Sequence, residues 1–243
     1  MESNILTTTL ADYVKQDFHA AAVFEKYGLD FCCRGKRPIG DACKDKNIDP
    51  EKVIEELNML RTNGSGKTER FDTWELDFLV DYIVNKHHSY VKEMLPTLSF
   101  HTQKIMSVHG DRHPELIKIA HLFAQVKTEL DQHLVKEEQI LFPYVKALAH
   151  AKKRGEPFPP NRFGTVMNPI AMMEQEHDAV GQMCFSIREL SSDYTPPPDG
   201  CTTYQITFKE LKEFEEDLHQ HIHLENNILF PKAIALEEEI QTA

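Results

Sequence analysis

Two segments, HLVKEEQILFP at 133–143 and HIHLENNILFP at 221–231, share the pattern H-x-x-x-E-x-x-I-L-F-P. Each follows a long stretch in which apolar residues recur every three or four positions, the period of an amphipathic α-helix. The same period runs on through the motif, so its histidine and glutamate lie on the apolar face. The repeat therefore predicts two related helices, each with a His–Glu pair on its buried side.

The apolar period predicts four long helices in total, over 72–108, 112–153, 165–192 and 203–239. They are separated by HGDR, GEPFPPNRFG and TPPPDGC, which are rich in helix-ending Gly and Pro. Short connections place successive helices side by side and antiparallel. The predicted fold class is all-α, with an antiparallel up-down four-helix bundle over residues 67–243.

Residues 1–66 are expected to form a separate, small helical domain. Helical periodicity runs from about Leu10 to Tyr27, where Gly28 ends it, and starts again at Pro50. The segment TNGSGKTER at 62–70 has the composition of a flexible linker.

Composition excludes several classes of protein. The 243 residues carry a formal charge of -12, which disfavours binding to nucleic acid or to anionic lipid. No apolar run is long enough to span a bilayer, and the first residues do not resemble a secretory signal. Five cysteines, two of them adjacent, do not form a disulfide framework, so a reducing cytoplasm is the expected location.

The other two bundle helices each contribute one inward histidine, His87 and His177. Register decides between neighbours, because two residues along a helix turn it by about 200°. His87 is therefore predicted to face inward rather than His88. By the same argument His221 faces inward rather than His219 or His223.

A single histidine on an apolar face is usually a hydrogen-bonded core residue. Glu137 and Glu225, however, would be buried charges with no Lys or Arg on the same faces, and a bound cation would offset that cost. Each carboxylate can bridge two cations, so the set predicts a dinuclear metal site. Redox-active iron suits imidazole and carboxylate ligands, while zinc and manganese remain open. The predicted ligands are His87, His133, Glu137, His177, His221 and Glu225.

Three prolines lie nine or ten residues after the histidines of their helices. Pro96, Pro143 and Pro231 lack an N–H and crowd the carbonyl four residues back, so each is expected to bend or reseat its helix.

With these motifs the chain resembles the hemerythrin-like superfamily of non-haem di-iron bundles and, more closely, the repair-of-iron-centres proteins. The narrower resemblance rests on YGLDFCCRGKRPI at 27–39, EQEHD at 174–178 and the TPPP and CTT segments within 195–203. It implies two iron ions with an oxo or hydroxo bridge, held by the six residues above. It also implies a catalytic role for Glu176, beside His177, as a nearby acid. The alternative from the sequence alone is an exposed helix glutamate.

The resemblance further implies repair of iron–sulfur clusters damaged by nitric oxide or oxidants, through release of labile iron. The partners implied are damaged iron–sulfur proteins and the small ligands NO or O2. Reduction of nitric oxide at the di-iron centre and reversible sensing of O2 or NO are the alternatives, and a homodimer is left open.

Cys32 and Cys33 form a possible thiol site. Arg34, Lys36 and Arg37 lie close in sequence, and their positive field would favour thiolates that take part in nucleophilic or metal-transfer chemistry. The alternative is that both cysteines are small buried residues of the N-terminal domain.

Overall fold

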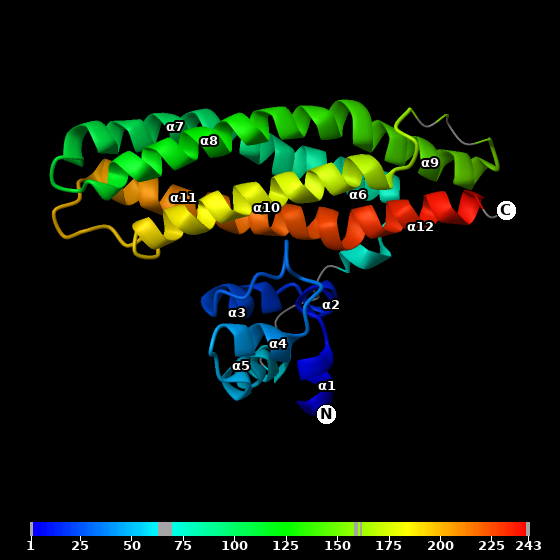
Figure 1. Cartoon of the computed structure of the whole chain (residues 1–243), viewed down its shortest axis with the longest axis horizontal. Helices are drawn as coiled ribbons and strands as arrows, with labels where there is room; N and C mark the ends of the chain where they lie inside the picture. The colour runs from blue at the N-terminus through cyan, green and yellow to red at the C-terminus, as the bar shows by residue number, and fades with distance from the viewer. Residues whose placement is uncertain (1, 63–69, 158–159, 161, 242–243) are drawn as a thin grey trace.

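The chain folds as a long bundle of four helical rods with a small helical domain packed against it (Figure 1). The structure, a computed structural model, describes residues 2–62, 70–157, 160 and 162–241. Apart from an isolated bridge between Thr9 and Pro38, these residues form no β-structure. The predicted all-α class and four-helix bundle are confirmed.

The rods begin and end within a few residues of the predicted limits. A short 3₁₀ turn, η1 (Phe71–Thr73), precedes the first rod. In chain order the rods consist of α6 (Leu76–Ile83), η2 (Val84–His88) and α7 (Ser89–His109); α8 (Glu115–Lys136), η3 (Glu137–Leu141) and α9 (Phe142–Arg154); α10 (Met167–Leu190); and α11 (Thr202–Leu224), η4 (Glu225–Leu229) and α12 (Phe230–Gln241).

The elements η2, η3 and η4 are single π-helical turns inside three of the rods. A π turn accommodates one extra residue and so shifts the register of the residues after it by about 100°. After η2 the first buried residues are Val91 and Leu95. An uninterrupted three- and four-residue period from Ile83 through His87 would instead lead to Tyr90 and Met94. Ile140 in η3 is 52% exposed for the same reason, although the period placed it inward.

Two of the prolines explain where π turns occur. Pro143 and Pro231 are the second residues of α9 and α12, directly after η3 and η4. A proline there cannot donate to a carbonyl in the preceding turn, which favours a local change of helix geometry. Pro96, in contrast, lies inside α7 without a break in the helix.

The core consists of two apolar clusters separated by buried polar side chains. One cluster includes Phe123 and Phe214 in the half of the bundle formed by α7, α8 and α11, and it continues into the N-terminal domain through Phe24. The other includes Phe142 and Phe230 in the half formed by α6, α9 and α12. The buried side chains of His88, Glu137 and His177 lie at the junction of these two clusters, because along each of their helices the residues on one side belong to one cluster and those on the other side to the other.

The N-terminal domain contains more helices than its sequence predicted. The expected helix from Leu10 to Tyr27 is broken near Asp17, an extended residue that ends the first piece, and Gly28 follows the second piece with φ +62°. The predicted linker at 62–70 lies almost entirely outside the described residues. The helices are α1 (Glu2–Thr7), α2 (Leu10–Gln16), α3 (Ala20–Lys26), α4 (Ile39–Asp45) and α5 (Pro50–Thr62).

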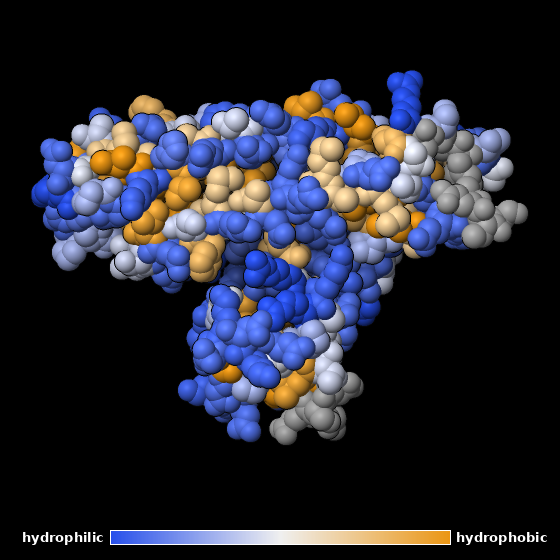
Figure 2. All heavy atoms as spheres, in the orientation of Figure 1, coloured by the Kyte–Doolittle hydropathy of each residue, from blue (hydrophilic) through white to orange (hydrophobic). Residues whose placement is uncertain are grey.

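The N-terminal domain projects from the middle of the bundle, which gives the molecule a T shape (Figures 1 and 2). The turn between α3 and α4 makes part of the contact, and Glu25 of α3 adds to it, with Oε1 3.0 Å from Nδ1 of His219 in α11. Asn227 Nδ2, in η4, donates to the carbonyls of Phe31 and Cys32 at 3.3 and 3.1 Å. None of the described helices is both long enough and apolar enough to cross a membrane.

Candidate metal centre

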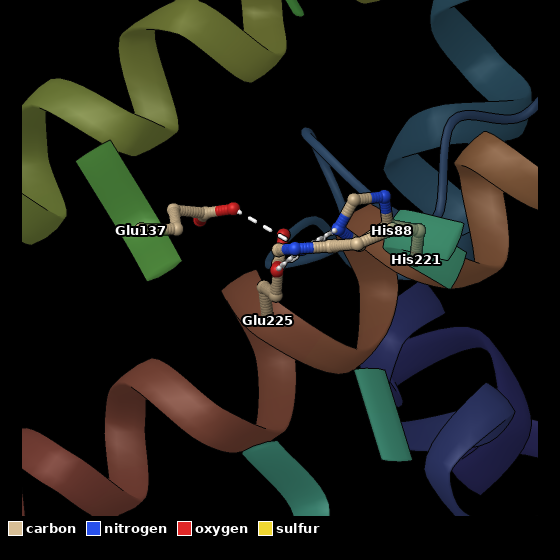
Figure 3. Close-up of side chains that lie close together, drawn as sticks. All are labelled: His88, Glu137, His221 and Glu225. Carbon is tan, nitrogen blue, oxygen red and sulfur yellow. Dashed lines mark hydrogen bonds and ion pairs between the residues drawn. The ribbon is translucent and has the colours of Figure 1, made fainter. Parts of the chain in front are cut away.

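Six buried side chains from all four rods meet between the two apolar clusters. They form two groups, His88 and His221 with the two glutamates and His133 and His177 with the same two glutamates. Within each group the potential ligand atoms lie within 4.8 Å of one another. Figure 3 shows the first group, in which the imidazoles and carboxylates point toward each other. Glu137 and Glu225 are common to both groups.

Five of the six predicted ligands are in this cluster, but His87 is not. The π turn η2 shifts the register so that His88 points into the cluster. His87 is also fully buried, but its Nδ1 lies 2.9 Å from a carboxylate oxygen of Asp217. The prediction that register favours His87 over His88 is therefore wrong, whereas the choice of His221 over His219 and His223 agrees with the cluster.

The spacing of the imidazoles suits two metal ions. Nε2 of His88 lies 3.1 Å from Nε2 of His221, and Nε2 of His133 lies 2.9 Å from Nε2 of His177. Two ligand atoms at about 2.1 Å from one ion, at right angles, are separated by about 3.0 Å. The structure thus pairs the histidines, which the sequence did not.

Unpaired oxygens provide a further test of fit. Both carboxylate oxygens of Glu137 and one of Glu225 are buried and lack a hydrogen bond among the described residues. The imidazole nitrogens of His88 and His133 lie 3.4 and 3.3 Å from Glu137. Buried carboxylates without hydrogen bonds are costly unless a cation is bound. The donor set therefore fits a pair of cations.

Without a metal ion, the imidazoles would balance the two carboxylates. Burial opposes a charged His88, but the nearby carboxylates of Glu137 and Glu225, at 3.4 and 3.6 Å, raise its pKa to about 10. Burial likewise opposes a charged His133, and Glu137 raises its pKa to about 9. Burial and Glu225 work against a charged Glu137, yet its histidine neighbours lower its pKa to about 2. These histidines therefore carry the positive charge that a metal would supply.

Three of the four histidines are oriented through Nδ1 by residues outside the cluster. Nδ1 of His88 lies 2.8 Å from Glu138, which Lys92 also contacts. Nδ1 of His177 lies 2.8 Å from the side-chain oxygen of Asn226. Nδ1 of His221 has no partner among the described residues. Such contacts fix the tautomer and direction of a metal-binding imidazole.

Glu176 belongs to this outer set. Its Oε2 lies 2.9 Å from Nδ1 of His133, and its Oε1 contacts Lys136. Glu176 is therefore close to the cluster, as expected, but it contacts the cluster only through His133. His88, Glu138 and Asn226 were not predicted from the sequence. Glu138 with Lys92 orients His88 in the same way as Glu176 with Lys136 orients His133, and this similarity is visible only when the helices are packed together.

The structure places Cys32 and Cys33 in the turn that packs on the bundle. For Cys32 the surroundings act against the expected thiolate. A hydrogen bond to Cys33, burial and the charge of Asp30 raise the pKa of the Cys32 thiol well above its usual value. Lys36 is paired with Glu174 and Arg37 with Asp45, so part of their positive charge is offset by other carboxylates.

Comparison with known families agrees with both parts of the structure. Residues 79–233 match the family described as the hemerythrin HHE cation binding domain. Residues 6–61 match ScdA_N, described as a domain of unknown function. The first match spans every residue of the His/Glu cluster, so the bundle is a cation-binding domain of the hemerythrin type.

Curated relatives are similar over almost the full chain. The iron-sulfur cluster repair protein YtfE of Citrobacter koseri is 36% identical over 219 residues, which are 90% of this chain and 92% of the relative. The proteins of the same name from Escherichia coli and Shigella boydii are 35% identical with the same coverage. The chain therefore belongs to the hemerythrin-domain family of iron–sulfur cluster repair proteins.

Proposed function

We propose that this chain is a di-iron protein that repairs iron–sulfur clusters damaged by nitrosative or oxidative stress, by donating iron from the His/Glu cluster. The observation that carries the proposal is the pair of four-residue groups that share Glu137 and Glu225. The names of the relatives support the repair function. The proposed partners are damaged iron–sulfur proteins of the cytoplasm.

In this proposal one iron would be held by His88 and His221, the other by His133 and His177, and both by Glu137 and Glu225. Two divalent ions carry more charge than two carboxylates offset, so an oxo or hydroxo bridge would complete the balance. The iron pair supplies redox chemistry and open coordination positions for small ligands. The protein contributes only two anionic residues to the pair, and the four imidazoles are neutral ligands that protons displace. Such a centre suits release of iron to an acceptor.

The residues around the cluster orient its ligands. Glu176 holds Nδ1 of His133 and is itself held by Lys136, so we assign it the role of a positioning residue rather than a catalytic acid. Glu138 and Lys92 do the same for His88.

Transfer of iron to an acceptor tests the proposal. The iron-loaded chain is mixed anaerobically with an apo iron–sulfur protein, sulfide and a reductant, and cluster formation is followed by absorbance. We expect the chain to lose iron as the acceptor gains a cluster. The double variant Glu137→Ala, Glu225→Ala should supply none. Glu210→Ala is the matched control, because this glutamate lies on α11 with His101 as its partner, away from the cluster.

The alternatives predict other outcomes of the same experiment when nitric oxide is added. A nitric oxide reductase would turn over NO to nitrous oxide with an electron donor while it keeps its iron. A sensor would form a stable adduct with O2 or NO at fixed stoichiometry. Either result, with no iron reaching the acceptor, would overturn iron donation.

A further inference from the structure

The turn between α3 and α4 brings one carboxylate and two thiols together. The backbone amides of Cys32 and Cys33 both donate to Oδ1 of Asp30, at 3.1 and 2.9 Å. This arrangement places Sγ of Cys32 3.3 Å from Oδ1 of Asp30 and 3.9 Å from Sγ of Cys33. One potential ligand atom from each of the three residues lies within 4.8 Å of the others.

These distances are those of a metal-binding triad. An ion with tetrahedral bonds of about 2.3 Å to sulfur and 2.1 Å to oxygen separates two sulfurs by about 3.8 Å, and a sulfur from an oxygen by about 3.6 Å. The observed separations of 3.9 and 3.3 Å differ from these values by a few tenths of an ångström. Little rearrangement would be needed to bind one ion.

The triad faces a cavity between the N-terminal domain and the bundle. The cavity has a volume of about 460 Å³, and Asp30, Cys32 and Cys33 line it together with Asp178, Gly181 and Gln182 of α10. A Cβ on Gly181 would lie 3.7 Å from Sγ of Cys33, so the helix backbone passes close to the thiol. The cavity provides room for a fourth ligand and a path for exchange.

Charge favours a cation at the triad. When ionised, the two thiols and the carboxylate repel one another, and Cys32 is only 5% exposed, so solvent screens this repulsion poorly. A divalent ion bound by all three residues would offset most of the combined charge of the two thiolates and the carboxylate, and the two backbone amides that donate to Asp30 would offset part of the rest. Thiolate ligands select zinc, ferrous iron and other thiophilic ions over magnesium and calcium.

We propose that Asp30, Cys32 and Cys33 form a second, mononuclear metal site for a thiophilic divalent cation, with a fourth position open to the cavity. Binding releases one proton from each thiol and involves no redox step. The geometry of the three residues supports the site by itself. Only the identity of the ion bound in the cell, iron, rests on the proposed function.

The triad is also close to the His/Glu cluster. Gly181 lies one helical turn after His177, a rise of about 6 Å. Asn227, which holds the carbonyls of Phe31 and Cys32, is two residues from Glu225. A metal ion passing between the cluster and the cavity would meet this triad.

Cobalt titration of the full-length, metal-free chain tests the second site. Co²⁺ bound by thiolates has an intense sulfur-to-metal charge-transfer band, which imidazole and carboxylate ligands do not produce. We expect the intensity of this band at saturation to correspond to one thiolate-bound Co²⁺ per chain, and the band to be absent from the double variant Cys32→Ser, Cys33→Ser. Asp30→Asn should weaken the binding that produces the band by about tenfold or more. Cys201→Ser is the matched control and should retain it, because Cys201 lies at the start of α11 beside His109.

Two outcomes would overturn the site: no thiolate band with the parent chain, or a band that persists in the double serine variant. The variant Glu137→Ala, Glu225→Ala separates this inference from the proposed function. It should lose iron donation yet keep the cobalt–thiolate band. Loss of the band in that variant would also contradict an independent second site.

Discussion

Each histidine of the cluster uses its two ring nitrogens for different purposes. Nε2 points at the carboxylates of Glu137 and Glu225, while Nδ1 of His88, His133 and His177 points outward to a hydrogen-bond partner. On two helices that partner is a glutamate tied to a lysine. The ligand directions are therefore fixed before a metal arrives, which lowers the entropic cost of binding.

Substitution of the adjacent histidines tests the helix register directly. We expect His88→Gln to reduce bound iron from two ions per chain to one or fewer, because His221 would lose its partner ligand. His87→Gln should retain two, since glutamine can still bond to Asp217. Analysis of bound iron after anaerobic reconstitution distinguishes the two variants. Loss of iron from His87→Gln but not from His88→Gln would identify His87 as the ligand.

The pKa values of the cluster predict how pH affects the metal-free chain. His88 and His133 have pKa values raised to about 10 and about 9 in the fold, against about 6.5 when unfolded. A raised pKa stabilises the fold below the unfolded value, and that stability is lost as pH rises through the folded value. The melting temperature of the chain in chelator should therefore fall between pH 6.5 and 9.5.

His133→Gln provides the comparison for this pH effect, because it removes one of the two groups. Its melting temperature should fall less steeply over the same range. Parallel curves for the parent and the variant would show that His133 does not carry the expected charge.

Among the helices, the sequence predicted the rods and most of the inward positions. The agreement is complete where a rod is a continuous α-helix. In α10 the residues that follow the three- and four-residue period are all buried, namely Ile170, Met173, His177, Val180, Cys184 and Ile187. The errors begin at π turns. A repeat of three and four residues contains no sign of an inserted residue, so His88, Val91 and Leu141 could not be identified from period alone.

The helices of the N-terminal domain were harder to predict, since α1 and α4 have only six and seven residues. Helices this short have fewer than two turns, so their apolar residues do not repeat often enough to show a helical period. Their stability comes from packing with the rest of the domain rather than from local sequence.

Gly181 in α10 allows a test of how closely that helix approaches the thiol turn. Glycine inside a helix costs about 0.5–1 kcal/mol relative to alanine. A Cβ at this position would meet Sγ of Cys33 at 3.7 Å, an ordinary van der Waals distance. Gly181→Ala should therefore raise the free energy of unfolding by about 0.5–1 kcal/mol in urea denaturation. Gly181→Leu should destabilise the chain, and stabilisation by leucine would argue against close contact between α10 and the thiol turn.

In the molecule as a whole, η4 joins the two domains. Its first residue, Glu225, belongs to the cluster, and the side-chain oxygen of Asn226 contacts Nδ1 of His177. The side chain of Asn227 donates to the backbone of the turn that carries the two cysteines. His223, near the end of the preceding helix, is buried against Phe31 with ring centroids 5.7 Å apart. The metal cluster and the cysteine turn are thus both contacted by residues of a single helical turn.

The docking of the N-terminal domain can be measured through Cys32. Asn227→Ala removes two hydrogen bonds, worth about 1–2 kcal/mol together, so the turn should open about tenfold more often. We expect alkylation of Cys32 by N-ethylmaleimide, followed by mass spectrometry, to accelerate by about that factor. Cys43 is the internal control, because it is fully buried within the N-terminal domain. An equal increase at Cys43 would indicate general unfolding rather than undocking.

The proposed function depends above all on Glu137 and Glu225 holding a pair of metal ions between four histidines. Anomalous diffraction at the iron edge, from crystals of the iron-loaded chain, is the decisive measurement. We expect two peaks that share both glutamates, one bound by His88 and His221 and the other by His133 and His177. A single peak, or an iron bound by His87 in place of His88, would refute this arrangement.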